Sequence, residues 1–356
     1  MEGPLSIHGN AYELMKLLPN GEQVFDVIRR YERLLARERR EGHEPGDALA
    51  FIAPFLIHHA LSSDDIGDQA KNAVIVPGAQ ELIASLSGWQ VFCITTSYEQ
   101  YARRIMDRVG IAPENLACTV FPIERYGRSL QEEDHQIVAD AERDILAIQD
   151  GDDGTIASRL DRFYGRELPP TSLGPALREV KPMGGTRKLA ALQRFAAAQG
   201  QSVDRAVVVG DSVTDAVMLH AVNTAGGLAV AYNADERSLP SATVGLASAH
   251  LSDLKAVLDA WREGGRERVE KLVREKEKLG GAGDRENLHW LPGRSDVQAV
   301  LQTHQRVRRT VLQQAGKAHW SGRGCPHISP GSPPKRSATR VQPPYTAGNA
   351  PSRRPG

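Results

Sequence analysis

The chain has 356 residues, of which 40% are hydrophobic, and its 44 basic residues balance its 44 acidic ones. This length and hydrophobic content suffice for one large or two ordinary domains with a real core, and for an enzyme. The zero net charge gives no global sign of a protein that binds nucleic acid or a membrane surface.

The first long segment, residues 10–72, predicts helices, because its apolar side chains recur at spacings of three and four. The sequence Pro19-Asn20-Gly21 separates the first two helices. A third is expected over residues 47–61, where Asp47 is placed to cap it.

Residues 73–114 predict the start of a parallel sheet. A brief apolar stretch at 74–76 leads to a short helix over 79–86, and residues 89–95 predict a strand that ends in Thr95-Thr96-Ser97. Residues 98–109 predict a helix, which Gly110 closes. A strand followed by a helix is the unit of a parallel sheet.

Residues 115–180 predict an insertion on that sheet. A short strand is expected over 116–122, and the polar stretch 129–166 has helical spacing of its apolar residues. The run Asp150-Gly151-Asp152-Asp153-Gly154-Thr155 within it resembles a nucleophile motif by eye, but we interpret it as a polar turn, since Gly151 falls where a nucleophile belongs.

Residues 181–261 predict the second half of the sheet. Residues 187–199 form an amphipathic helical pattern, and the apolar run 206–209 predicts a strand buried on both faces. Further strands are expected at 228–232 and near Val244, and a closing helix over 251–261. The alternation of strands and helices predicts an α/β fold with a doubly wound parallel sheet.

The C-terminal part changes in composition. Residues 262–291 carry a dense run of charges that predicts a solvated helix. From residue 292 to 356, proline, glycine, serine and arginine dominate with almost no acidic residue, so we expect a disordered basic tail. Non-specific contact of this tail with nucleic acid is a minor alternative, which would weaken steeply with salt.

Cysteine usage and hydropathy bear on location. Three widely spaced cysteines, Cys93, Cys118 and Cys325, have no metal-ligand spacing, and their odd number argues against a disulfide framework. No apolar run approaches the roughly 20 residues needed to cross a bilayer, and the start has no signal-peptide pattern. We expect a soluble cytoplasmic protein with no membrane partner.

The most informative stretch is residues 206–215, which sets Asp211 and Asp215 at the exit of the predicted buried strand. Ligand sites of open α/β sheets lie at the carboxyl ends of strands. If Ser212 or Thr214 opens a helix, both carboxylates point to one pocket, a hard oxygen cage suited to Mg²⁺. Taken alone, the pair is equally well explained as a helix cap with a favourable acid in the first turn.

Together with three other segments, this pattern resembles the haloacid dehalogenase (HAD) superfamily of Mg²⁺-dependent phosphotransferases, nearer its phosphoserine-phosphatase-like branch. The resemblance covers roughly residues 1–260. The family's last motif, Gly-Asp-x-x-x-Asp, is met by Gly210, Asp211 and Asp215. Its Thr or Ser at a strand end matches Thr95, with Thr96 as the alternative.

Two further family positions are matched in different degrees. The Lys that opens a later helix matches Lys188, with Lys181 as the fallback. The first motif, Asp-x-Asp-Gly, survives only as Glu2-Gly3, with Met1 in the x position. The resemblance then places the nucleophilic Asp and the first strand immediately upstream of Met1, so that this chain is expected to lack turnover. The alternative explanation is a true truncated variant without hydrolase activity.

The resemblance implies a Mg²⁺-dependent phosphomonoester hydrolase that acts through an aspartyl-phosphate on a small phosphorylated metabolite. Phosphoryl transfer needs an in-line nucleophile and charge neutralisation. The resemblance implies Asp211, Asp215 and Glu2 as metal ligands. It also implies that Lys188 and Thr95 bind phosphoryl oxygens and that Glu2 is the general acid. The alternative is a non-catalytic HAD-like module that binds metal or phosphate and acts through partners.

The resemblance also gives the domain plan. Residues 10–72 become a helical cap over the site, in which His58 and His59 either face the substrate or form an ordinary histidine pair. The full division follows the chain: 1–9 remnant of the first motif, 10–72 helical cap, 73–114 core, 115–180 second insertion, 181–261 core, 262–291 charged helix, 292–356 tail.

Overall fold

Five parallel strands and one antiparallel strand form two sheets in the computed structural model, which describes residues 1–7, 9–279 and 287–321, with the backbone alone for 316–321. β1 (Cys93–Tyr98) pairs in parallel with β2 (Leu116–Thr119). The second sheet has the order β3-β4-β5-β6, with the bounds Val207–Gly210, Leu228–Tyr232, Val244–Ala247 and Asn287–Trp290. β6 is its antiparallel member. The chain therefore has the predicted mixed α/β fold, but its strands form two sheets in place of the single parallel sheet that we expected.

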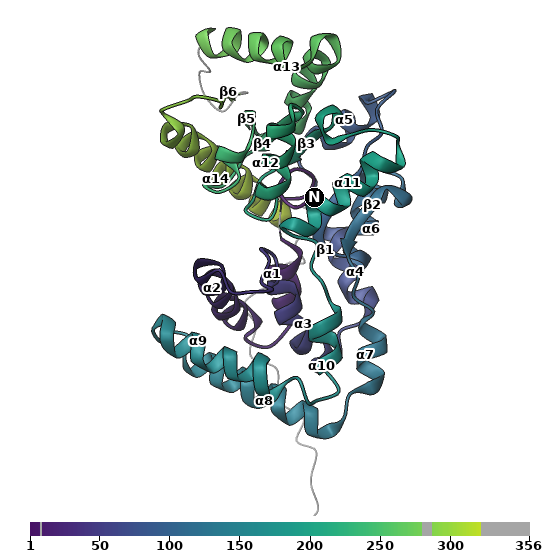
Figure 1. Ribbon diagram of the computed structural model, residues 1–356. Helices are drawn as coiled ribbons and strands as arrows, with labels where there is room; N and C mark the ends of the chain where they lie inside the picture. The colour runs from purple at the N-terminus through teal and green to yellow at the C-terminus, as the bar shows by residue number, and fades with distance from the viewer. Residues whose placement is uncertain (8, 280–286, 322–356) are drawn as a thin grey trace, which may run out of the picture.

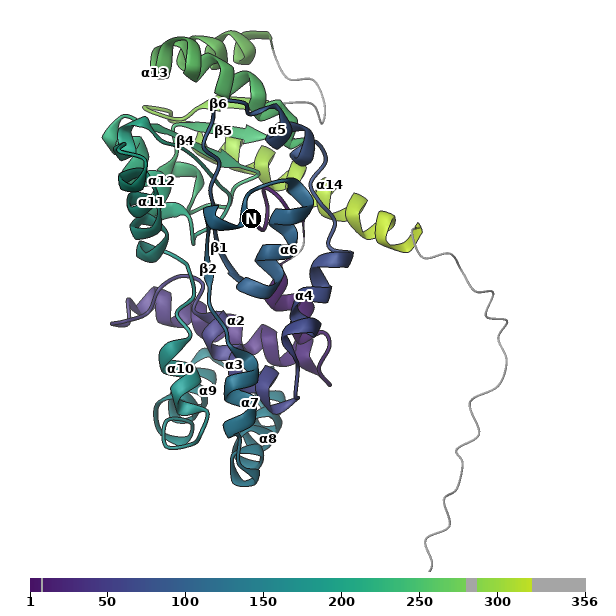
Figure 2. The same cartoon turned by 90° about the vertical axis from the view of Figure 1, so that its right-hand side faces the viewer.

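Helices lie on both sides of the second sheet (Figure 2). α11 (Thr186–Ala198) packs against α12 (Ala216–Ala225), and α12 contacts β3 and β4. On the other side, α14 (Val297–Ser321) contacts β5. Beside the first sheet, α6 (Glu99–Val109) packs on β1 and on α4 (Ser63–Asn72), and α5 (Ala79–Ser85) lies near them.

A further group of helices forms one helical body below the sheets (Figure 1). It contains two chain segments: α1 (Asn10–Met15), α2 (Gly21–Glu38) and α3 (Ala48–His58) from the first, and α7 (Ile123–Ser129), α8 (Glu132–Ala147), α9 (Asp153–Arg162) and α10 (Gly174–Glu179) from the second. The Tyr31 hydroxyl donates to Asp161 at 2.6 Å, and the Tyr164 hydroxyl donates to the Phe51 carbonyl at 2.9 Å. The two segments predicted as separate insertions thus pack together.

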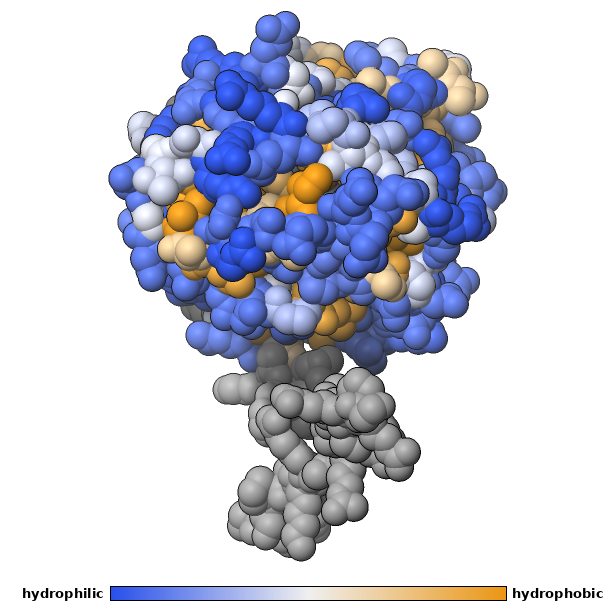
Figure 3. Space-filling view, turned by 90° about the horizontal axis from the view of Figure 1, so that it is seen from below, coloured by the Kyte–Doolittle hydropathy of each residue, from blue (hydrophilic) through white to orange (hydrophobic). Residues whose placement is uncertain are grey.

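The surface of the helical body is mainly hydrophilic when it is seen from below, with small separate hydrophobic areas (Figure 3). Its interior is apolar, since Phe55, Phe163 and Ile52 are fully buried there. No helix among the residues described here is long and apolar enough to cross a membrane.

Several predicted elements are found with shifted bounds. The strand expected over 89–95 is β1, which begins at Cys93 and runs on to Tyr98, because its parallel partner β2 spans only Leu116–Thr119. The helix expected to open at Ser212 or Thr214 begins at Ala216, with Asp215 in the N-cap position. The strand at 228–232 and the helix over 98–109 are confirmed to within one residue.

The prediction of a charged helix over 262–291 is wrong in part. α13 (Leu254–Leu279) includes the expected closing helix and the charged run, with non-helical backbone at Gly264 and Gly265. Val269 and Val273 are buried on its second half. β6 then occupies 287–290, where it pairs with β5.

The prediction of a disordered tail from residue 292 is also wrong for its first part, because α14 spans Val297–Ser321. The apolar residues of α14 recur at helical spacing and are buried: Val300, Leu301, Val307, Val311 and Ala315. His304 lies on the same face and is fully buried, and its Nδ1 accepts the Ala234 N–H at 2.9 Å. The prediction missed this helix because it used the average composition of residues 292–356, which is polar although α14 has one apolar face. Residues 322–356, including Cys325, lie outside the described part.

Candidate functional site

The turn after β3 brings Asp211 and Asp215 together in the interior, each about 5% exposed. Gly210 ends the strand, and a Cβ there would lie 2.5 Å from the Asp215 Cβ. Only glycine leaves room for the Asp215 side chain to fold back under the turn. The short apolar strand and its glycine therefore position both carboxylates at the carboxyl edge of the sheet.

Asp215 is fully occupied by partners within the protein. Its Oδ1 accepts a hydrogen bond from Lys188 Nζ at 2.7 Å, and its Oδ2 accepts the backbone N–H groups of Asp211 and Ser212 at 3.1 and 3.2 Å. Burial by itself raises the pKa of this carboxyl, but the charge of Lys188 and these hydrogen bonds outweigh it, and the pKa is lowered. Asp215 is thus a buried anion that holds Lys188 in place.

Asp211 has the opposite electrostatic character. Burial raises its pKa to about 7, and the neighbouring Asp215 acts in the same direction. Arg308 of α14 lies 3.3 Å from Oδ2 and lowers the pKa, as do the Met1 ammonium group and Lys188. The carboxyl therefore changes its charge near neutral pH, which suits a group that binds a cation or exchanges a proton.

The first residues of the chain lie against this site. A Cβ on Gly3 would fall 2.4 Å from the Asp211 carboxylate, and Gly3 has a φ of +90° that favours glycine. Glu2 faces the other sheet, because its Oε1 accepts the Ser97 hydroxyl at 2.7 Å and the Asn10 N–H at 2.9 Å. Residues Glu2 and Gly3 thus connect the end of β1 with the turn after β3.

The two threonine candidates lie within β1 rather than at its end. Thr95 is buried and exchanges hydrogen bonds with Ser97, which in turn donates to Glu2. Thr96 contacts a different part of the site, since its Cγ2 lies 2.9 Å from the position of a Cβ on Gly46 and 3.5 Å from that on Gly184. Thr95 therefore points toward Ser97 and Glu2, whereas Thr96 points toward Gly46 of the helical body.

The two lysine candidates differ in environment. Lys188 is 4% exposed and paired with Asp215, whereas Lys181 is exposed. Only Lys188 is brought to the two carboxylates by the fold.

A loop of the helical body, residues 44–47, covers the N-terminal end of α11 beside Lys188. The Glu44 carboxylate accepts the Thr186 N–H at 3.1 Å, and Asp47 pairs with Arg187 at 2.7 Å. Asp47 occupies the N-cap position of α3 without a side-chain cap bond, so the predicted capping role is wrong. No local sequence pattern predicts these contacts, because the partners lie 140 or more residues apart.

Glu32 anchors the same loop from below. Its Oε1 accepts the Gly46 N–H at 2.7 Å and the Ala48 N–H at 3.4 Å, and burial raises its pKa. The loop is therefore fixed to both α2 and α11, which makes it a rigid edge of the site.

The predicted Mg²⁺ ligands do not converge as a set. Among the residues that the structure describes, one group of three potential ligands has its atoms within 4.8 Å of one another, and it is His58, His59 and Glu142. Asp215 and Glu2 already bind other partners. Asp211 is itself paired with Arg308 through Oδ2, so at the turn after β3 this donor set offers Mg²⁺ the Asp211 Oδ1 as a single carboxylate oxygen.

The turn over residues 150–155 has a structural role. Asp152 caps α9 by accepting the Thr155 N–H at 2.8 Å, and Asp153 pairs with Arg30 at 2.7 Å. The predicted polar turn is therefore found only at residues 150–152, because residues 153–155 form the first turn of α9.

Comparison with known proteins shows that this fold occurs in a solved structure. No protein-family model and no curated protein matches the chain. The chain is similar to the solved structure of gene product AF1437 from Archaeoglobus fulgidus, with a TM-score of 0.77 and 26% sequence identity, over 89% of this chain and 96% of that one. The arrangement of sheets and helical body is therefore shared across almost the whole of both chains.

Proposed function

We propose that this chain has a HAD-like, Rossmann-like fold and supports Mg²⁺-dependent hydrolysis of a phosphomonoester. The proposal rests on the order of the motifs along the chain and on the place of Asp211, Asp215 and Lys188 at the carboxyl edge of β3. The nucleophile in this proposal is an Asp immediately before Met1.

One observation carries the proposal, which is that β3 is the edge strand of its sheet and lies next to the first residues of the chain. β1 and β3 belong to separate sheets, and β3 has partly exposed residues at Val207 and Val209, whereas β4 and β5 are buried throughout. A partly exposed strand is typical of a sheet edge. Met1 starts beside this edge, since Glu2 binds β1 and Gly3 contacts Asp211. A strand that ends just before Met1 would lie between β1 and β3 and place its last side chain at the site.

The residues of the chain then have distinct tasks. Asp215 fixes Lys188, whose ammonium group neutralises charge on a phosphoryl oxygen. Asp211 is the residue that would hold Mg²⁺, which supplies further neutralisation of phosphoryl charge. Glu2 carries the proton for the leaving group, and its hydrogen bonds from Ser97 and Asn10 set its orientation.

The helical body has the role of a cap in this proposal. The loop at residues 44–47 reaches the N-terminal end of α11 next to Lys188, so the body is in position to exclude water and to select substrate. The substrate class is a small phosphorylated metabolite of the cytoplasm.

A specific observation favours the alternative of a non-catalytic module. Arg308 pairs with Asp211, so a cation at Asp211 must displace the guanidinium or share the carboxylate with it. A non-catalytic protein can keep that ion pair permanently. The genomic DNA upstream of Met1 separates the two functions: an in-frame apolar strand that ends in Asp supports the hydrolase, and a stop codon supports the alternative.

The direct test uses the chain preceded by a short apolar strand that ends in Asp, and a matched control in which the strand ends in Asn. We expect Mg²⁺-dependent hydrolysis of p-nitrophenyl phosphate with the Asp version and little with the Asn version or with the chain from Met1. Equal rates for the Asp and Asn versions would refute the placement of the nucleophile. Hydrolysis that survives Asp211→Asn would refute the role of Asp211.

A further inference from the structure

A second group of potential ligands lies in the helical body, at the contact between α3 and α8. His58 is the last residue of α3 and His59 is its C-cap. His135 and Glu142 lie seven residues apart on α8, so they share one face of that helix. The four side chains are partly buried. Two helices from distant parts of the chain thus bring three imidazoles and one carboxylate to one place.

The polar atoms of this group face one another. His59 Nε2 lies 2.9 Å from Glu142 Oε1, and His58 Nδ1 lies 3.0 Å from His135 Nδ1. The potential ligand atoms of His58, His59 and Glu142 all lie within 4.8 Å of one another. In a tetrahedral zinc site the ligand atoms are roughly 3.3–3.6 Å apart, given bonds of about 2.0–2.2 Å. Small side-chain rotations therefore suffice to bring three ligands to a common centre.

The contact between His58 and His135 favours metal binding, because each imidazole ring has a second nitrogen outside this contact. A neutral imidazole is the form that coordinates a metal. The Nδ1 atoms of His58 and His135 lie 3.0 Å apart, so they cannot both carry a proton, because two N–H groups would then point at each other.

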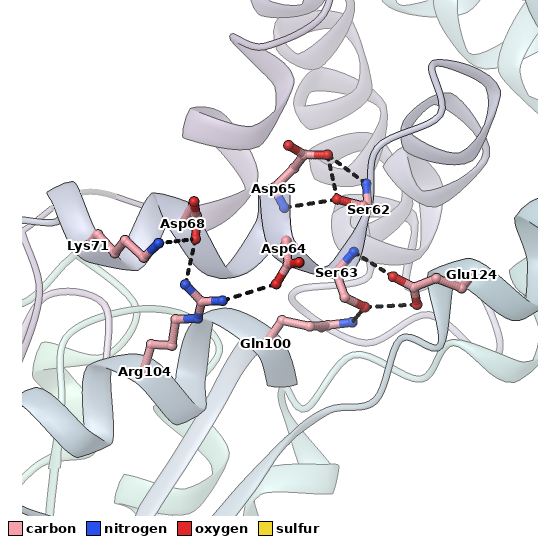
Figure 4. A network of polar contacts seen from close by, with 9 residues as sticks. All are labelled: Ser62, Ser63, Asp64, Asp65, Asp68, Lys71, Gln100, Arg104 and Glu124. Carbon is pink, nitrogen blue, oxygen red and sulfur yellow. Dashed lines mark hydrogen bonds and ion pairs between the residues drawn. The ribbon is translucent and has the colours of Figure 1, made fainter.

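The surrounding chain fixes the end of α3. Directly after His59, the Ser62 and Asp65 side chains cap α4, and Ser63 binds Glu124 of α7 through its N–H at 2.7 Å and its hydroxyl at 2.8 Å (Figure 4). Arg104 of α6 adds ion pairs to Asp64 and Asp68. These contacts hold the turn that carries the two histidines, which reduces the ordering that a bound ion would require.

We propose that His58, His59 and Glu142 bind one transition-metal ion of the Zn²⁺ class, with His135 at the fourth position. Imidazole and carboxylate ligands suit Zn²⁺, whereas Mg²⁺ prefers oxygen ligands alone. The ion joins α3 to α8 and thereby braces the helical body. This site is separate from the one at Asp211, and it does not depend on the proposed hydrolase function.

The test is a titration of the tag-free, chelator-treated full chain with Co²⁺, followed by the visible absorption of tetrahedral Co²⁺ and by competition with Zn²⁺. We expect one Co²⁺ per chain and a tetrahedral spectrum at pH 7.5, with an affinity that falls in acid because protons compete with the metal for the ligand atoms. His59→Ala should weaken binding at least tenfold. Glu142→Gln, which keeps the size of the side chain, should weaken it by about tenfold.

Matched controls separate this site from other metal binding. His220→Ala removes an exposed histidine of α12, and Asp211→Asn removes the carboxylate of the other site; both should retain one Co²⁺ with an unchanged spectrum. Circular dichroism verifies that each variant is folded, and Glu142→Gln serves if His59→Ala is not. Absence of tetrahedral Co²⁺ in the parent chain, or equal affinity in the parent and Glu142→Gln chains, would overturn the proposal in favour of a metal-free hydrogen-bond network.

Discussion

The ion pair between Lys188 and Asp215 gives the sharpest stability prediction. Lys188→Met keeps the length of the side chain but removes the charge, so Asp215 is left buried without its cation. The two side chains are 4% and 7% exposed, and solvent does not screen the loss. Removal of one partner from a buried pair costs about 3–5 kcal/mol. We expect the free energy of unfolding of Lys188→Met to fall by that amount at pH 7.

The assay is urea unfolding followed by circular dichroism, with Lys181→Met as the matched control. Lys181 is exposed, so its replacement should change the free energy of unfolding by less than about 0.5 kcal/mol. The double variant Lys188→Met, Asp215→Asn should recover part of the loss, because it removes the uncompensated charge while the amide oxygen still accepts backbone N–H groups.

The pH dependence of this difference follows from the loss of the cation beside Asp215. In the parent chain the pKa of Asp215 is below its ordinary value of 3.8, so its stabilising contribution is constant between pH 7 and pH 4 and is lost only at lower pH. In Lys188→Met, burial without the cation raises the pKa of Asp215, so the variant regains stability as this carboxyl becomes protonated. The difference between the parent chain and Lys188→Met should therefore shrink on going from pH 7 to pH 4. A Lys188→Met variant within 0.5 kcal/mol of the parent at pH 7 would refute the description of this pair as a buried, mutually dependent one.

Three further predictions concern neighbouring parts. The pKa of Asp211 is raised to about 7 in the folded protein, so the parent chain loses stability as the pH rises from about 4 to 7. Asp211→Asn should therefore be more stable than the parent by about 2–4 kcal/mol at pH 8 but not at pH 4, as measured by urea unfolding. His304→Ala should cost about 1–3 kcal/mol in the same assay, since it leaves the buried Ala234 N–H without its acceptor, and an unchanged midpoint would contradict the docking of α14. Gly3→Ala should displace residues 1–3 from Asp211, and a thermal midpoint equal to that of the parent would show that the N-terminal contact is absent in solution.

The order of elements was largely predictable from the sequence. The apolar run at 206–209 and the strand at 228–232 have few polar residues and short lengths, and both are strands of the parallel sheet. The two segments of the helical body were predicted as helical from their spacing, but their mutual packing rests on contacts such as Tyr31 with Asp161, 130 residues apart. Contacts of that separation leave no local pattern in a single sequence.

The site was predictable in its residues but less so in its contacts. The motif spacing selected Lys188, Asp211 and Asp215, which the fold brings together. The motif spacing did not predict that Lys188 binds Asp215 directly. A carboxylate that follows a strand can bind either a metal ion or a lysine, so the residue type does not distinguish the two. Arg308 was missed for a different reason, since it lies in the stretch whose average composition indicated disorder.

The proposed hydrolase requires a reactive carboxylate directly before Met1, between β1 and β3. The most direct measurement is mass spectrometry of the Asp-extended chain, quenched in acid during turnover of a phosphomonoester with Mg²⁺. We predict one phosphoryl group on the added Asp, and none on the Asn-extended chain. A phosphoryl group on another residue, or turnover by the Asn-extended chain, would contradict the account.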